Sequence, residues 1–154
     1  MTSDPSSKIN RLLKKWPSGA VAVLPWLEKQ GVYQQLIHEY EKTSWVRRIG
    51  RGAYVREGDK VQWTGGLYAL QEQLGLPIHP GGKTALSMQG YAHFLPMGQG
   101  ATVVVFGPPN AKLPLWFMQY RWGVKTRFTT TNLFIGKDDH GLTQKDMGFY
   151  SVSV

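Results

Sequence analysis

The chain has 154 residues, of which 42% are hydrophobic and 18% are charged, enough for one core or for a small domain with part of a second. The absence of cysteine excludes disulfides, cysteine-ligated zinc and a cysteine nucleophile, and no apolar run approaches the roughly 18 residues of a membrane span. Eighteen basic and ten acidic residues give a net charge of +8, which favours an anionic partner, most commonly nucleic acid. Eleven of the basic residues and six of the acidic ones fall in residues 1–62.

The first 31 residues predict two helices around a short strand. An Asp-Pro pair before apolar residues at helical spacing predicts a helix over 7–16. The β-compatible segment 21–23 follows, and residues 24–30 predict a second, compact helix. Gly31 can take the left-handed conformation that ends this helix.

A third helix is predicted over 33–43. Its apolar residues, Tyr33, Leu36, Ile37 and Tyr40, follow the i, i+3, i+4, i+7 spacing of one helix face. Because a short turn with a glycine joins it to the preceding helix, the pair is typical of a helix-turn-helix unit. The opposite face carries groups that can bond to base edges or phosphates: Gln34, Gln35, His38, Glu41 and Lys42.

An arginine-rich hairpin is predicted over 45–56, with a Gly-Arg-Gly turn and no acidic residue between its ends. An amphipathic helix followed by such a hairpin is typical of the recognition helix and wing of a winged helix-turn-helix, which we expect over residues 1–58. An ordinary helix and hairpin with a solvated basic face is the alternative. The candidate DNA-binding residues are Tyr33, Gln34, Gln35, His38, Lys42, Arg47, Arg48, Arg51 and Arg56.

These candidates have different expected roles. Glutamines in the first turn can each offer a donor and an acceptor to an adenine, while Lys42 and the arginines suit phosphates. Glu39 and Glu41 would repel phosphates, so we expect them to point sideways or to pair with the basic hairpin.

Residues 57–60 are polar and turn-forming, and they mark the boundary to a small mixed α/β domain over 63–154. The fold class is therefore α+β. The expected elements of the second domain are a helix from Trp63 to Gly75, a helix over 83–90, a strand over 101–106, a strand or short helix over 115–120, and strands over 126–135 and 149–154.

No pattern supports catalysis, a cofactor or a metal. The glycine that a phosphate loop needs before the Gly82-Lys83 pair is replaced by Pro77, so a helix start is the better interpretation. The four histidines lack metal-ligand spacing, and no GxSxG motif is present. We expect His93 to be structural and residues 138–140 to form a surface turn, and we expect no enzymatic activity.

The chain resembles the N-terminal part of the AbiEi-type antitoxins, regulators of type IV abortive-infection toxin–antitoxin operons in bacteria. Residues 45–55 are similar to the wing of that family. Residues 81–86 and 89–93 resemble its GG-[RK]-TAL…QG-x-AH element, and residues 141–151 resemble a later segment. The resemblance covers about residues 7–154.

The resemblance implies a cytoplasmic, nucleoid-associated autorepressor of phage defence. Its winged helix would bind double-stranded DNA at inverted repeats in its own promoter. Its C-terminal domain would oppose a nucleotidyltransferase-like toxin without forming a stable complex with it. No membrane partner is expected. Val32 and Tyr33 stand where the family usually has a Ser or Thr cap, and the family's second domain continues further, so we expect 63–154 to be truncated relative to it.

A second hypothesis is a protein-interaction module without sequence-specific DNA binding. It would use exposed aromatic side chains of the second domain, such as Trp116 and Phe117. Salt dependence separates the hypotheses, because phosphate contacts release counterions and an aromatic interface does not.

Overall fold

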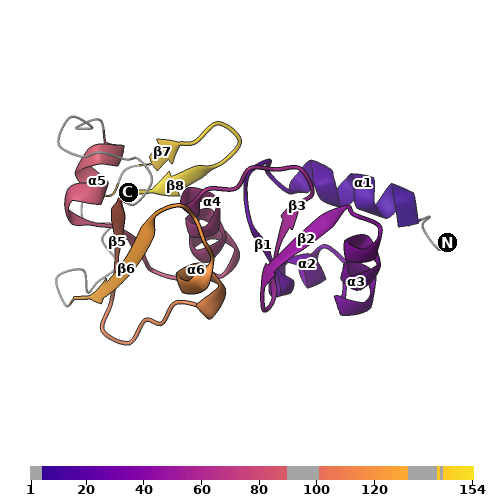
Figure 1. The fold of residues 1–154 in the computed structure, drawn as a ribbon, viewed down its shortest axis with the longest axis horizontal. Helices are drawn as coiled ribbons and strands as arrows, with labels where there is room; N and C mark the ends of the chain where they lie inside the picture. Colours follow the sequence, from indigo (N-terminus) through magenta and orange to yellow (C-terminus); the bar gives the residue numbers. More distant parts are fainter. Residues whose placement is uncertain (1–4, 90–100, 132–141, 143) are drawn as a thin grey trace.

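The structure, a computed structural model, describes residues 5–89, 101–131, 142 and 144–154. Figure 1 shows two groups of elements side by side: α1–α3 with β1–β3 in one, and the remaining helices and strands in the other. The fold is a mixture of helices and small sheets, as expected. No helix in the described part of the chain is long and apolar enough to cross a membrane.

The first group contains three helices and one antiparallel sheet of strand order β1-β3-β2. The three predicted helices and the hairpin are confirmed to within two residues at each end, the usual uncertainty of helix limits. The elements are α1 (Pro5–Lys15), β1 (Ala22–Val23), α2 (Leu24–Lys29), α3 (Gln34–Lys42), β2 (Val46–Gly50) and β3 (Ala53–Arg56).

One face of this sheet packs against α1, α2 and α3. Side chains alternate between the two faces of a strand, so Ala22 and Tyr54 contact the helices while their neighbours contact the other side. Trp16 ends the apolar stripe of α1, and its indole Nε1 donates a hydrogen bond of 2.8 Å to the Ala20 carbonyl. The buried side chains of this core include Ile9, Leu12, Leu27, Ile37, Tyr40 and Val46.

The second group holds a three-stranded sheet of order β4-β5-β6 and a β7-β8 hairpin. Strands β5 and β6 are parallel, and the connection between them contains α6, because parallel neighbours need a crossover. The elements are α4 (Trp63–Tyr68), the π-helical turn η1 (Ala69–Gln73), β4 (His79–Pro80), α5 (Gly82–Met88), β5 (Thr102–Gly107), α6 (Leu115–Gln119), β6 (Lys125–Thr130), β7 (Gln144–Asp146) and β8 (Ser151–Ser153).

The predicted helix over 83–90 and the strands over 101–106 and 149–154 correspond to α5, β5 and β8, whereas β4 and β7 were not predicted. The helix from Trp63 continues after Tyr68 as a π-helical turn, and the segment 115–120 is a short helix. Strand β6 ends at Thr130, and residues 132–135 of the predicted strand lie outside the described residues.

The second core covers the opposite face of the first sheet. Val23, Ala53 and Val55 from that sheet are buried in one cluster with Leu67 and Leu70. Helix α4 can approach because residue 65 is glycine: a Cβ atom there would collide with the carbonyl oxygen of Gly19. Strands β1 and β3 are therefore buried on both faces, which explains the unbroken apolar run of the short β1 segment.

Two glutamines of η1 extend this packing through hydrogen bonds. The side-chain amide of Gln73 accepts a bond of 2.8 Å from the Val23 N–H and donates one of 3.0 Å to the Val21 carbonyl. The Gln71 amide makes the same kind of pair with Ser153, at 2.8 and 2.9 Å. The turn η1 thus pairs backbone N–H and C=O groups at the free edge of β1, and it also binds β8 through hydrogen bonds.

Candidate nucleic-acid interface

Helix α3 buries Ile37 and Tyr40, and Leu36 is half-buried. The prediction that Tyr33 belongs to the apolar face of this helix is wrong, because its side chain is 61% exposed. Tyr33 is the N-cap residue with extended backbone angles (φ −92°, ψ 172°), so it lies outside the helical periodicity. No side chain caps the helix start, as the absence of Ser or Thr there suggested.

The opposite face of α3 is exposed and polar. It presents Gln34, Gln35, His38 and Lys42, whose spacing places them on one stripe of the helix. The two glutamates pair within this helix, so of the two expected arrangements the pairing with the hairpin is not seen. His38 Nδ1 lies 3.7 Å from a Glu41 oxygen, and Lys42 Nζ lies 3.8 Å from an oxygen of Glu39. Exposed pairs of this kind contribute at most about 1 kcal/mol and break easily for a competing phosphate.

Strands β2 and β3 form the wing hairpin, residues 46–56. Its register shifts by a bulge between Arg48 and Gly50, and Gly52 supplies the left-handed turn conformation (φ 75°). Arg47, Arg48 and Arg51 are exposed on it. The Arg48 Nε donates to the Gly50 carbonyl at 3.1 Å, which holds that side chain along the hairpin.

Arg56 differs from the other three arginines. Its Nη1 donates a hydrogen bond of 3.1 Å to the Trp16 carbonyl, and its Nε lies 3.8 Å from an Asp59 carboxylate oxygen. The same carboxylate accepts a bond of 2.9 Å from the Gly19 N–H. Arg56 is half-buried and joins the end of α1 to the loop after β3, contacts that favour a structural role.

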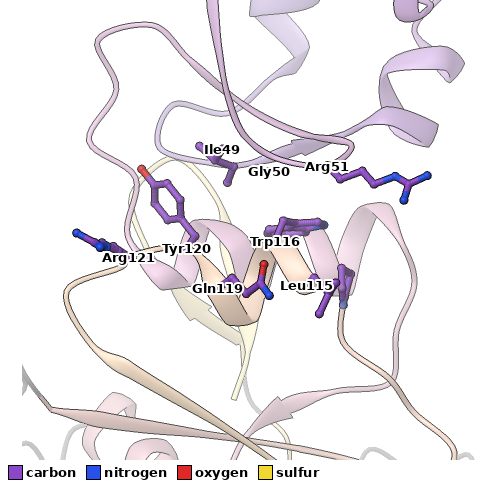
Figure 2. Close-up of a pocket in the computed structure, with 9 residues that line it drawn as sticks. Ile49, Gly50, Arg51, Leu115, Trp116, Gln119, Tyr120 and Arg121 are labelled. Atoms are coloured by element: carbon purple, nitrogen blue, oxygen red, sulfur yellow. The ribbon is translucent and has the colours of Figure 1, made fainter.

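A groove of about 670 Å³ separates the wing hairpin from α6 (Figure 2). Arg47 Nη1 donates to the Tyr120 hydroxyl at 3.3 Å across the two groups of elements. Sequence reasoning did not find this site, because only the fold brings its two sides together. The lining residues are Ile49, Gly50, Arg51, Pro114, Leu115, Trp116, Gln119, Tyr120 and Arg121.

The expectation that Trp116 and Phe117 are exposed is wrong. Trp116 is 6% exposed because its Cα and Cβ atoms pack against Gly50, and Phe117 lies fully inside the second core. The Trp122 indole donates a hydrogen bond of 2.8 Å to the Phe117 carbonyl and closes the turn after α6. The large apolar side chain that α6 does expose is Leu115, at 69%.

Other candidate chemistry is not supported by the described residues. The Gly-Lys-Thr segment begins α5, where the Thr84 hydroxyl accepts a bond of 2.9 Å from the Val104 N–H of β5 and is buried. Within the described ranges, no three His, Cys, Asp or Glu residues gather in a way that could hold a metal ion. His93 and residues 138–140 lie outside the described residues.

The fold and the basic hairpin define a mixed α and β protein whose N-terminal group carries an exposed polar helix face. Residues 5–97 match the family model described as "Transcriptional regulator, AbiEi antitoxin N-terminal domain". The chain belongs to this family of transcriptional regulators, which confirms the resemblance drawn from the sequence. The family is one of regulatory antitoxin domains and not of enzymes.

A similar solved structure is the crystal structure of the RV2827C protein from Mycobacterium tuberculosis. It is 16% identical, with a TM-score of 0.51, and the alignment covers 86% of this chain. It covers 47% of that chain, so the present chain spans about half of its length. At this identity the likeness supports the fold alone. No curated protein sequence matches the chain significantly.

Proposed function

We propose that residues 1–58 form a winged helix-turn-helix domain that binds double-stranded DNA. The order α1-β1-α2-α3-β2-β3, with a three-stranded antiparallel sheet, supports this proposal, as does membership of a transcriptional regulator family. In this arrangement α3 enters the major groove and the wing hairpin lies along the backbone.

The observation that carries the proposal is the separation of charge between α3 and the wing hairpin. Helix α3 holds one lysine against two glutamates, whereas the hairpin holds four arginines and no acid. The hairpin is therefore better suited than α3 to supply non-specific attraction, and the neutral glutamines of α3 are free to read bases. Arg47, Arg48 and Arg51 are the proposed phosphate contacts.

The proposed base contacts lie at the start of α3. Gln34 and Gln35 are exposed in the first turn, the part of a recognition helix that reaches base edges. His38 is one turn further and can bond to a base or to a phosphate, and Lys42 lies at the far end, where a phosphate is its target. Tyr33 adjoins the first turn and can donate its hydroxyl to the backbone.

The proposed biological role is autorepression within a type IV toxin–antitoxin operon. The regulator would bind inverted repeats in its own promoter in the bacterial cytoplasm, and the whole protein would oppose a nucleotidyltransferase-like toxin without a stable complex. Family membership supports this role. A gel mobility shift compares DNA from upstream of its own gene with a scrambled duplex of equal length and composition. We expect tighter binding to the upstream DNA; equal binding would contradict operator recognition, and absent binding would contradict the whole proposal.

A further inference from the structure

The groove between the wing hairpin and α6 continues the basic surface into the second half of the chain. Residues 101–131, which include α6, hold four basic and no acidic side chains. The wing hairpin has the same imbalance, and no acidic residue lines the groove. The groove therefore has no acidic side chain that would repel an anion, and its charge favours a negatively charged occupant.

The two arginines that line the groove, Arg51 and Arg121, are available to such an occupant. Among the described residues, neither Arg51 nor Arg121 forms an ion pair or a side-chain hydrogen bond, whereas Arg47 is held by Tyr120. Figure 2 shows Arg51 beyond one end of α6 and Arg121 beyond the other, pointing away from each other. The occupant must therefore be extended and carry negative charge at two separated points.

The middle of the groove is mostly apolar and its width is fixed. Leu115 and Tyr120 stand on the α6 side, and Ile49 lies opposite them on the wing hairpin. The close contact of Gly50 with Trp116 holds the hairpin and α6 at one separation. Sugar groups between charged phosphates match such walls better than a uniformly charged ligand does.

Resting on the proposed DNA binding, we infer that this groove receives a phosphodiester strand of the same duplex, with Arg51 and Arg121 on separate phosphates. A duplex carries charges at regular short intervals along each strand, so it can meet both ends of the groove. The second half of the chain then contributes directly to affinity. An acidic protein segment is the weaker alternative, because the aromatic anchors Trp116 and Phe117 are buried.

The test is a salt series of fluorescence anisotropy with a duplex of about 30 base pairs and mixed sequence, a probe that reports phosphate contacts. Arg121→Gln should flatten the slope of log K against log salt by about 0.9, the value for one phosphate, and weaken binding about five- to tenfold at 0.1 M salt. Arg121→Lys should retain most of the slope. The control Lys145→Gln removes one charge from exposed β7, away from α6 (Figure 1), and should leave the slope unchanged.

An unchanged slope in Arg121→Gln, with wild-type protein still binding, would overturn this inference and leave the proposed function intact. Wild-type protein that binds no duplex would overturn both. Leu115→Ser, followed by sedimentation velocity, tests for a second copy of the chain in the groove. We expect no change in oligomeric state, and reduced self-association with an unaltered salt slope would assign the groove to a protein interface instead.

Discussion

Gly50 of the wing hairpin meets Trp116 of α6 so closely that a Cβ atom added at position 50 would lie 2.6 Å from the Cβ of Trp116. No side chain fits there without movement, so the hairpin and α6 hold each other at one distance. The position of the proposed DNA-binding hairpin thus depends on the second half of the chain.

Gly50→Ala should displace the hairpin from α6 and lower the free energy of unfolding by about 1–3 kcal/mol. DNA affinity should fall as well, although no charge changes. Thermal unfolding and anisotropy with a mixed-sequence duplex measure the two effects. Gly58→Ala is the control for destabilisation alone, since its positive φ (87°) strains a side chain there although the space around it is open. Equal losses of DNA affinity in both variants would reduce the Gly50 effect to general destabilisation.

Gln35→Ala tests base reading by α3. A bidentate glutamine–adenine contact contributes about 1–3 kcal/mol of discrimination, so affinity for the native operator should fall roughly tenfold or more. Binding to random duplex should hardly change, since the side chain is neutral. Parallel titrations on the two duplexes decide the role. Equal losses of affinity on the two duplexes would make Gln35 a contact to the DNA backbone. No loss on either would mean that this helix face does not contact DNA.

Gln73→Leu tests the tie between η1 and the first sheet. It removes both hydrogen bonds to β1 and leaves the Val23 N–H and the Val21 carbonyl unpaired, which should cost about 2–4 kcal/mol in the free energy of unfolding. Urea unfolding at neutral pH measures the loss. Gln62→Leu is the matched control at an exposed site and should change stability by at most about 0.5 kcal/mol. Similar losses of unfolding free energy in the two variants would contradict a stabilising role for the hydrogen bonds of Gln73.

Burial raises the pKa of the Tyr150 phenol above its usual value of 10, and its hydrogen bond of 2.9 Å with Thr64 lowers it by less. A raised pKa in the folded protein means that the unfolded chain ionises first. The contribution of neutral Tyr150 to the free energy of unfolding is therefore complete below pH 10, and it is lost as the pH rises through the pKa of the folded protein. Tyr150→Phe should make the alkaline fall of stability shallower in urea unfolding between pH 8 and 11. An identical pH profile would contradict this assignment.

The local elements were predictable because their signals are local. The spacing of Leu36, Ile37 and Tyr40 was sufficient for α3, and the Gly-Arg-Gly turn was sufficient for the hairpin. Tyr33 fits the same spacing yet is exposed, because the chain is still extended at the N-cap and the helical period has not begun. Periodicity thus identified the helix, but it did not predict that the side chain at its N-cap is exposed.

Tertiary contacts decided the rest of the candidate site. The burial of Trp116 depends on a hairpin some 65 residues away, and that hairpin fits only because it has a glycine at the contact. Arg56 looks like its neighbours in the sequence, but its hydrogen bond to the Trp16 carbonyl needs α1 in place. The lack of acids in residues 101–131 was a sequence signal for the groove, but its meaning depends on the nearby wing hairpin.

The central claim is that the wing hairpin binds DNA through phosphates, and the salt dependence of binding tests it most directly. Anisotropy titrations of wild type and of Arg48→Ala/Arg51→Ala on a random duplex give the two slopes. Two lost phosphate contacts should reduce the magnitude of the slope by about 1.8, and affinity should fall alike on every sequence. An unchanged slope and unchanged affinity for random duplex in the double variant would contradict the claim.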